Sequence, residues 1–292
     1  MQKLSQKTQG IVYVLIAAFG FSLMSMFVKL AGDLPSFEKA FFRNFVALIF
    51  ITILMLRSRT SFRPERRNLP ALFGRCFFGT LGLLCNFYAI GRLNLPDANM
   101  LNKLSPFFAI LFSIFLLREK PNLVQVLGVL VAFFGSVCII KPSFDNPQML
   151  PALAGVLGGL GAGAAYTFVR YLGARGENGS RIVFYFSAFS CLVCLPFLLL
   201  DYAPVSARQL VYLLLAGVFA CVGQLGITKA YVCAPAKEIS VYDYTQVLYA
   251  AALGFFVFGE VPDWLSVLGY VLICGAGVGM FLYNRRRDAA HP

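Results

Sequence analysis

Apolar residues run through the chain in ten long blocks, which short segments rich in charge, proline or glycine separate. A helix needs about 20 predominantly apolar residues to cross the hydrocarbon core of a bilayer. The pattern therefore predicts ten transmembrane helices and no β-strand. Their expected bounds are 9–31, 36–57, 69–92, 95–117, 123–141, 150–173, 181–200, 207–233, 236–259 and 263–284.

The composition places these blocks in a membrane. Hydrophobic residues make up 59% of the chain, charged residues only 13%, and the mean hydropathy is +0.75. A soluble domain carries roughly 25% charged residues, so an ordinary cytosolic enzyme is excluded, as are a disordered chain and a disulfide scaffold. The fold class that follows is an all-α integral membrane protein.

Charge sets the expected orientation. The net charge is +12, and the basic residues gather in short clusters between the blocks. Ten spans put both termini on one side, which holds 17 basic residues against 5 on the other. Basic loops stay in the cytoplasm, so we expect both termini there and a multi-pass protein of the plasma membrane, the inner membrane of a bacterium. No basic groove with interleaved aromatics lies outside the spans, so a nucleic-acid partner is not expected.

Metal and cofactor chemistry lacks its usual residues. Cys191 and Cys194 form a CxxC inside an apolar block with no second pair nearby, and the one histidine is His291. There is no glycine-rich phosphate loop, no cluster of carboxylates and no Ser/His/Asp set in the sequence. We therefore expect no metal, no cofactor and no enzymatic activity.

The chain repeats itself at a constant offset of 141 residues. Aligned pairs are Gly20 with Gly161, Phe27 with Phe168, Lys29 with Arg170, Gly82 with Gly223, Glu119 with Glu260 and Gly128 with Gly269. One offset without gaps indicates duplication, with halves at 9–141 and 150–284. Each half holds five spans, an odd number, so the second half enters the membrane from the opposite side. Inverted repeats are typical of secondary transporters, whose site lies near the midplane between the halves.

Several motifs resemble those of the drug/metabolite transporter superfamily, in its EamA-type branch with two EamA repeats. They are Phe42-Arg43, the stretch from Asp97-Ala98 to Ser105-Pro106, Arg118-Glu119-Lys120-Pro121 with Gly128, and Gly259-Glu260-Val261-Pro262 with Gly269. The resemblance covers nearly the whole chain. It implies a central cavity lined mainly by spans 1, 3, 4, 6, 8 and 9, with spans 5 and 10 at the periphery. The second half departs from the pattern, because Phe184 stands where an arginine would match Arg43.

Three charges lie inside predicted spans, where each costs at least ~2.5 kcal/mol unless it finds a partner or a cavity. They are Arg43 in span 2, Lys103 in span 4 and Asp243 in span 9. The offset pairs Asn102 with Asp243, so Lys103 and Asp243 occupy the same layer of the two inverted halves. We expect that they can meet across the cavity.

The functional hypothesis is that Lys103, with Asn99 and Asn102, contacts a carboxylate or another anionic group of a solute. Asp243 would then hold the solute's ammonium group or take up a proton. The alternative is a plain Lys103–Asp243 ion pair that locks one conformation, and a gating pair that opens on solute binding satisfies both hypotheses. Pro106, one turn after Lys103, would supply a hinge.

Further side chains are assigned by their position in the spans. Arg43 is open to two interpretations, a brace for helix ends or a solute contact, and each tyrosine can equally pack between helices. The expected wall of the cavity comprises Asn86, Tyr88, Tyr166, Gln224, Tyr242, Tyr244, Gln246 and Tyr249. The expected structural residues are Arg75, reaching to the headgroups, Glu119 and Glu260, at the N-termini of the helices that follow them, and Gly155, Gly159 and Gly163, a stripe for close helix packing.

The sequence thus predicts a secondary transporter of a small polar metabolite, such as an amino acid or another carboxylated compound. Alternating access through the central cavity is expected, export is favoured by the family resemblance, and proton coupling stays open. Alternatives are a transporter of an organic cation or drug-like amphipath held by Asp243, or, less favoured, a membrane enzyme or scaffold. The expected partners are the solute and the bilayer, and the chain is expected to be a monomer or homodimer.

Overall fold

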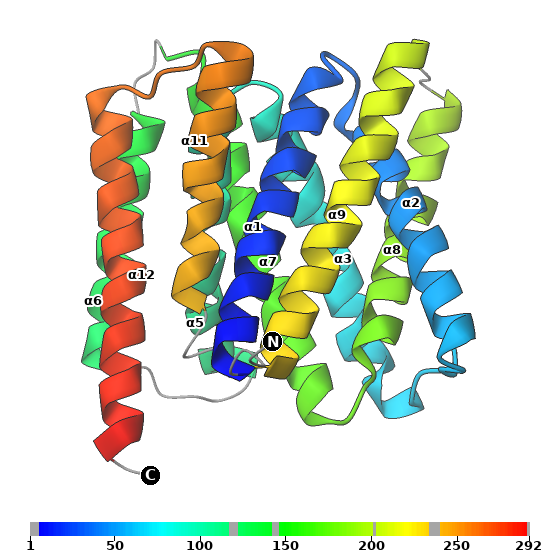
Figure 1. The fold of residues 1–292 in the computed structure, drawn as a ribbon, viewed down its shortest axis with the longest axis horizontal. Helices are drawn as coiled ribbons and strands as arrows, with labels where there is room; N and C mark the ends of the chain where they lie inside the picture. The colour runs from blue at the N-terminus through cyan, green and yellow to red at the C-terminus, as the bar shows by residue number, and fades with distance from the viewer. Residues whose placement is uncertain (1–5, 117–121, 142–145, 201–202, 234–239, 291–292) are drawn as a thin grey trace, which may run out of the picture.

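The computed structural model describes residues 6–116, 122–141, 146–200, 203–233 and 240–290, and every regular element in these ranges is helical (Figure 1). The first half comprises α1 (Gln6–Leu30), α2 (Ser36–Arg57), η1 (Arg66–Asn68), α3 (Leu69–Ile90), α4 (Leu95–Asn102), α5 (Ser105–Leu116) and α6 (Leu123–Ile140). The second half comprises α7 (Met149–Ala174), α8 (Gly179–Leu200), α9 (Ala207–Cys233), η2 (Ser240–Tyr244), α11 (Thr245–Phe258) and α12 (Trp264–Ala290).

The membrane fold predicted from the sequence is confirmed. Within the described ranges, eight helices are long and apolar enough to cross a bilayer, and they coincide with eight of the ten predicted spans. The other two predicted spans, 95–117 and 236–259, are not single long α-helices within the described residues. In the first, α4 ends at Asn102 and α5 begins at Ser105, and in the second the described part is the short 3₁₀ helix η2 followed by α11.

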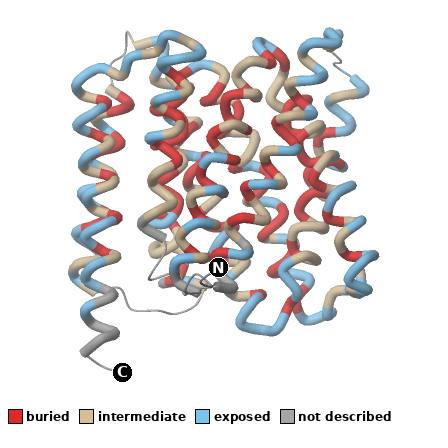
Figure 2. The backbone as a smooth tube through the Cα atoms, viewed as in Figure 1, coloured by how far each residue is buried: buried red, intermediate tan, exposed pale blue. Residues whose placement is uncertain are grey.

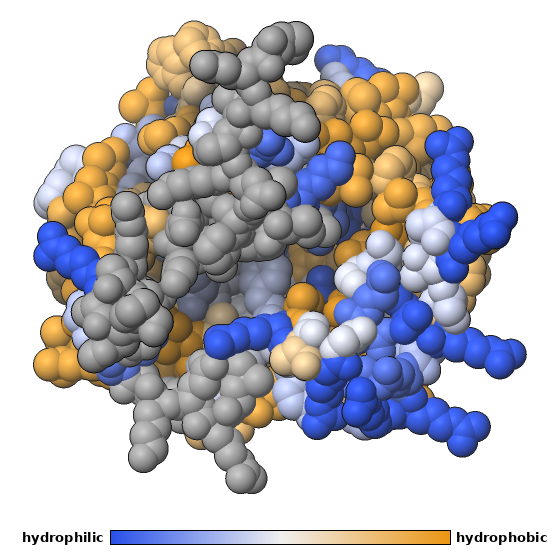
Figure 3. All heavy atoms as spheres, turned by 60° about the horizontal axis from the view of Figure 1, so that its bottom comes forward, coloured by the Kyte–Doolittle hydropathy of each residue, from blue (hydrophilic) through white to orange (hydrophobic). Residues whose placement is uncertain are grey.

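Successive membrane spans alternate in direction, with α4 and α5 together forming one span, so α1 begins and α12 ends at the same end of the bundle (Figure 1). We call this the terminal end and the opposite one the far end. Helix α7 starts at the far end, whereas its repeat partner α1 starts at the terminal end, so the two halves are inverted. Figure 3 looks toward the terminal end and shows hydrophilic side chains gathered on one side of it. Exposed arginines there are Arg59, Arg63, Arg66, Arg67 and Arg175.

The two halves pack against each other in pairs that follow the repeat. Helix α1 packs against α9 and α3 packs against α7, and the offset of 141 converts one pair into the other. Helices α2 and α8 form a third pair, and α6 and α12 form a fourth at one edge of the bundle, the peripheral place implied for spans 5 and 10 (Figure 1). Figure 2 shows buried positions concentrated inside the bundle and exposed positions along its outside. Phe134 and Val271 are among the exposed apolar residues.

Small residues set how closely the helices approach. A Cβ atom on Gly161 of α7 would lie 2.7 Å from the Cα atom of Gly82 on α3. The glycine stripe predicted on α7 faces the interrupted span: a Cβ on Gly159 would lie 2.8 Å from the Leu101 carbonyl oxygen, and one on Gly163 would lie 2.7 Å from that of Ser105. The stripe therefore lets α7 lie directly against α4 and α5.

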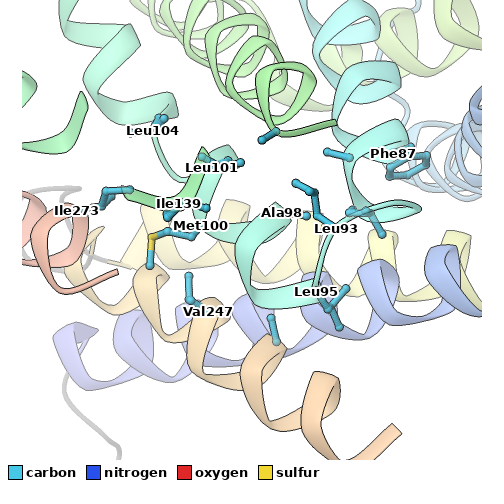
Figure 4. Packing of buried hydrophobic residues seen from close by; sticks show 14 of the residues in the cluster. Phe87, Leu93, Leu95, Ala98, Met100, Leu101, Leu104, Ile139, Val247 and Ile273 are labelled. Carbon is cyan, nitrogen blue, oxygen red and sulfur yellow. The ribbon is translucent and has the colours of Figure 1, made fainter. Parts of the chain in front are cut away.

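Helix α4 is surrounded by protein. Each residue from Leu95 to Leu101 is buried, and Figure 4 shows Leu95, Ala98 and Met100 among side chains from several neighbouring helices. The Tyr270 hydroxyl of α12 donates to the Asp97 carboxylate at 2.5 Å. This short helix avoids lipid, which explains why it can carry polar residues at membrane depth.

Replacing Gly161 with alanine should destabilise the fold, because the added methyl meets the α3 backbone. We expect a loss of about 1–3 kcal/mol, which is typical of overpacking, seen as a lower midpoint of thermal unfolding in detergent. Gly173→Ala on the same helix is the matched control, since its Cβ would have nothing within 4 Å, and it should unfold at or above the wild-type temperature. Equal midpoints for the two variants would contradict the close approach.

Candidate functional site

The interruption of span 4 has a clear cause. Pro106 is the second residue of α5 and has no backbone N–H, so it cannot bond to the carbonyl of Asn102 four residues earlier. Helix α4 therefore closes at Lys103, whose N–H donates to the carbonyls of Asn99 (3.1 Å) and Met100 (3.0 Å). Because α4 has 8 residues, it is only ~12 Å long. Its C-terminal end, with partial negative charge, therefore lies inside the bundle.

In span 9 the described residues begin with η2, which holds Asp243 and runs directly into α11 at Thr245. The N-terminal end of a helix carries partial positive charge and favours a carboxylate, whereas the C-terminal end favours a cation. Lys103 thus lies at the C-terminal end of α4 and Asp243 just before the N-terminal end of α11, and each helix end stabilises the charge beside it.

The structure brings Lys103 and Asp243 together, as the repeat predicted. The Lys103 Nζ atom lies 2.5 Å from Oδ2 of Asp243, and the two side chains are 10% and 28% exposed. An ion pair at this depth offsets part of the cost of burying each charge. Because more than a quarter of the Asp243 side chain stays accessible, the carboxylate is not fully enclosed by protein.

A polar network beside the ion pair joins α1, α4 and α11. The Asn99 side-chain oxygen accepts hydrogen bonds from the Gln246 amide at 2.8 Å and from the Ser25 hydroxyl at 3.1 Å. The Asn99 amide donates to the Leu95 carbonyl at 2.8 Å, and the Ser22 hydroxyl lies 2.9 Å from the Gln246 carbonyl oxygen. Two predicted site residues, Asn99 and Gln246, are therefore held next to the ion pair.

Asn102 and Pro106 flank the ion pair along the chain. Asn102 is half-buried at the end of α4, and Pro106 is exposed at the start of α5. A Cβ on Gly159 of α7 would lie 3.5 Å from the Asn102 carbonyl oxygen. Both residues thus lie at the break itself, where a change in the angle between α4 and α5 would move them.

Three predicted wall tyrosines pack between helices. Tyr244 lies against Gly277 of α12, where an added Cβ would be 2.5 Å from its hydroxyl. Tyr242 packs with the buried residues Val14 and Ala230. The Tyr249 ring makes an edge contact with Phe19 at 5.3 Å. The observed contacts of these three tyrosines are therefore those of residues that pack between helices, which was the alternative to a place in the cavity wall.

Two other predicted wall residues lie toward the far end. Asn86 of α3 is buried against Gly158 of α7, and its side-chain oxygen has no hydrogen-bond partner among the described residues. Tyr88 lines a separate pocket of about 450 Å³ near the far end, together with Lys39 and Arg92. The Arg92 guanidinium stacks on the Tyr88 ring at 4.0 Å.

Two arginines meet at one aromatic ring of α8. The guanidinium carbons of Arg43 and Arg75 lie 5.9 Å and 4.2 Å from the centre of the Phe186 ring. Arg43 and Phe186 also border a small cavity of about 30 Å³ that Gln224 lines from α9. The expectation that Arg75 reaches to the headgroups is wrong, because the side chain turns into the bundle and is buried. Tyr166 of α7 lies within electrostatic range of both arginines.

The far end is closed by contacts centred on Glu260. Its carboxylate pairs with Lys29 of α1 and accepts the Leu95 N–H at 2.7 Å, while Lys29 also donates to the Leu93 carbonyl at 2.6 Å. Glu260 was expected to meet the N-terminus of the following helix, but it meets that of α4 in the other half. Asp263 occupies the expected place, since its Oδ1 accepts the Ser266 N–H at 2.9 Å.

The carboxylate that lies at the start of α12 is that of Asp263. Burial alone would raise the pKa of Asp263, but hydrogen bonds from Lys141 and from backbone N–H groups hold this pKa below its usual value. Glu119, the repeat partner of Glu260, lies outside the described residues.

The site also contains three residues that the sequence analysis did not assign to it: Ser22, Ser25 and Arg75. Serines in apolar helices often bond only to their own helix, so the serines carried no usable signal.

Comparisons with known proteins agree with this architecture. The EamA-like transporter family matches residues 8–141 and 149–282. A pseudopaline exporter of Pseudomonas aeruginosa is 35% identical over 274 residues, covering 93% of this chain and 95% of that protein. An S-adenosylmethionine uptake transporter of Rickettsia prowazekii is 23% identical, covering 96% and 94%. A solved crystal structure at 15% identity superposes with a TM-score of 0.66 over 96% of this chain and 99% of that one, which shows a shared fold.

The Glu260 contact predicts an unequal effect of two similar substitutions. Glu260→Gln keeps an acceptor for the Leu95 N–H but removes the charge opposite Lys29, whose side chain is only 15% exposed. Breaking a buried pair in this way costs about 3–5 kcal/mol, so the variant should unfold at a clearly lower temperature. Asp263→Asn breaks a pair with Lys141 in which the carboxylate is 53% exposed, and it should cost at most about 1 kcal/mol. Equal thermal shifts would refute the bracing role of Glu260.

Proposed function

Since this chain belongs to the EamA-like transporter family, we propose that it is a secondary transporter of small polar solutes that carry a carboxylate, amino acids and related compounds foremost. The relatives are named as transporters, and the chain is a multi-pass membrane protein. Transport would proceed by alternating access of one central site between the inverted halves, 9–141 and 150–284.

The observation that carries the proposal is the Lys103–Asp243 ion pair, which forms between the end of α4 and the start of α11. Interrupted helices that meet at membrane depth form the binding sites of many transporters, because their free ends present charge and unpaired backbone groups. The pair also joins the two halves, since Lys103 follows α4 and Asp243 precedes α11. A solute that separates the two charges therefore acts on the contact between the halves.

A zwitterionic amino acid complements this pair. Its carboxylate would bind Lys103 with help from Asn99 and Asn102, and its ammonium would bind Asp243. Such a solute exchanges one ion pair for two, so the charges stay neutralised while the contact between the halves is released. This exchange unites the binding and the gating hypotheses, with Pro106 at the break as the hinge. Asp243 would carry a coupled proton where the solute has no ammonium group.

We further propose that both termini face the cytoplasm and that the protein exports its solute across a bacterial inner membrane. The excess of basic residues at the terminal end supports this orientation, and it makes the far end extracellular. The Glu260 contacts would then form part of the outer gate. The relative named as an exporter supports export, while the one named for uptake carries the opposite direction.

Uptake by proteoliposomes tests the proposal directly. We expect saturable uptake of at least one carboxylated solute from a labelled panel of amino acids, organic acids and quaternary amines, measured with and without a pH gradient. Lys103→Ala and Asp243→Asn should each lower uptake at least tenfold, because removing one partner leaves the other charge buried and unpaired. Arg208→Gln, which changes an exposed arginine at the far end, is the control and should transport normally.

Three outcomes are informative. Loss in both variants with a normal control supports the proposed site. Uptake of quaternary amines alone, lost in Asp243→Asn but kept in Lys103→Ala, would replace the carboxylated solute with an organic cation while keeping the transporter. Carboxylated solutes that are carried equally well by all three variants at every pH would refute the role of the ion pair.

A further inference from the structure

Arg43 of α2 and Arg75 of α3 lie deep in the bundle without an acidic partner. Each is only 8% exposed, and neither forms an ion pair within the described part of the chain. Among the described residues, Arg43 donates one hydrogen bond, to the Asn44 side-chain oxygen at 2.6 Å, and Arg75 donates none. Both buried Nε atoms lack an acceptor. A buried guanidinium without a counter-charge is costly, so its retention calls for a compensating partner.

Both guanidinium groups lie against the same aromatic ring, that of Phe186. A cation–π contact returns less free energy than burying an unpaired ion costs. Two buried cations on one ring therefore create a region of positive potential that an anion would stabilise.

The arginines have no charged counterpart in the second half of the repeat. At the offset of 141 their counterparts are Phe184 on α8 and Ala216 on α9. The arginines break the symmetry of the repeat, which is the expected mark of a residue that binds an asymmetric solute.

Tyr166 connects this arginine pair with the central ion pair. Its side chain is 56% exposed, and its hydroxyl lies within electrostatic range of Asp243 as well as of Arg75 and Arg43. In the proposed arrangement, Tyr166 lines the space between the two charge clusters. A solute held at Lys103 and Asp243 can therefore extend past Tyr166 toward the arginines.

We infer that Arg43 and Arg75, on the Phe186 ring, form a second anion-binding site, and that the transported solute carries at least two acidic groups. This inference rests on the proposed function, because it assigns the first acidic group to Lys103. The planar guanidinium fork matches a carboxylate with two parallel hydrogen bonds. Three buried cations against the single carboxylate of Asp243 suit an amino-acid-like solute with a second carboxylate.

The test compares ligands that differ only in one acidic group. Calorimetry on the purified full chain would measure the affinities of L-glutamate against L-glutamine and of succinate against succinamate. We expect the member of each pair that has two carboxylates to bind at least tenfold more tightly than the member that has one. Arg43→Gln and Arg75→Gln should abolish this preference and leave the amide-bearing member unchanged. Arg92→Gln is the matched control, since Arg92 also stacks on an aromatic ring but does so in the far-end pocket.

Folding is checked by the thermal midpoint of each variant. Where Arg75→Gln does not fold, Arg75→Lys keeps the charge but loses the fork, and the preference should fall several-fold. A preference that is absent in the wild type, or that survives in the folded arginine variants, overturns the second site. If carboxylated solutes are still taken up in the uptake assay, the second site alone has failed. If none is taken up, the proposed function has failed with it.

Discussion

The ion pair between Lys103 and Asp243 is the interaction on which the account of this protein depends. A charge at membrane depth requires a partner or access to water, and here the two charges are each other's partner. The end of α4 and the start of α11 place helix ends of suitable polarity beside them. The surrounding contacts hold this region in place. Helix α4 is buried, the glycine stripe of α7 packs against α4 and α5, and the Asn99–Gln246 hydrogen bond joins α4 to α11.

The sequence predicted the spans and the pairing of Lys103 with Asp243 for physical reasons. Lipid imposes a minimum length on apolar blocks, and a duplication with a constant offset places equivalent residues in equivalent layers. The faces of the helices were harder to predict. Tyr244 was read as part of a continuous helix, but it ends a 3₁₀ segment with 3.0 residues per turn, so its side chain points to Gly277 of α12. Where nearly every position is apolar, periodicity cannot separate the lipid face from the cavity face.

Long side chains were predicted least well, because their ends lie far from their backbone positions. Arg75 begins near the terminal end of α3 and was expected to reach outward, yet it turns inward to Phe186. Glu260 lies just before α12 in the chain, yet its carboxylate accepts the Leu95 N–H at the start of α4 in the other half. In both cases the charged end of the side chain lies at a different place from the one expected from its backbone position. The repeat supplies a symmetric frame, and the inferred anion site places its selectivity in charges present in one half only, Arg43 and Arg75.

The central claim is that the ion pair lies in a site that opens to one side of the membrane at a time. Labelling of a single cysteine at Asn102, beside Lys103, measures this most directly, in a chain whose eight native cysteines are replaced and whose uptake activity is retained. A membrane-impermeant thiol reagent is applied to either side of oriented vesicles. We predict that the Asn102→Cys side chain reacts from both sides and that the best solute of the uptake panel slows both reactions. Cross-linking α1 to the loop between α11 and α12, which holds Glu260, should abolish only the reaction from the far end. No reaction from either side, or reaction that the solute and the cross-link leave unchanged, would contradict the account.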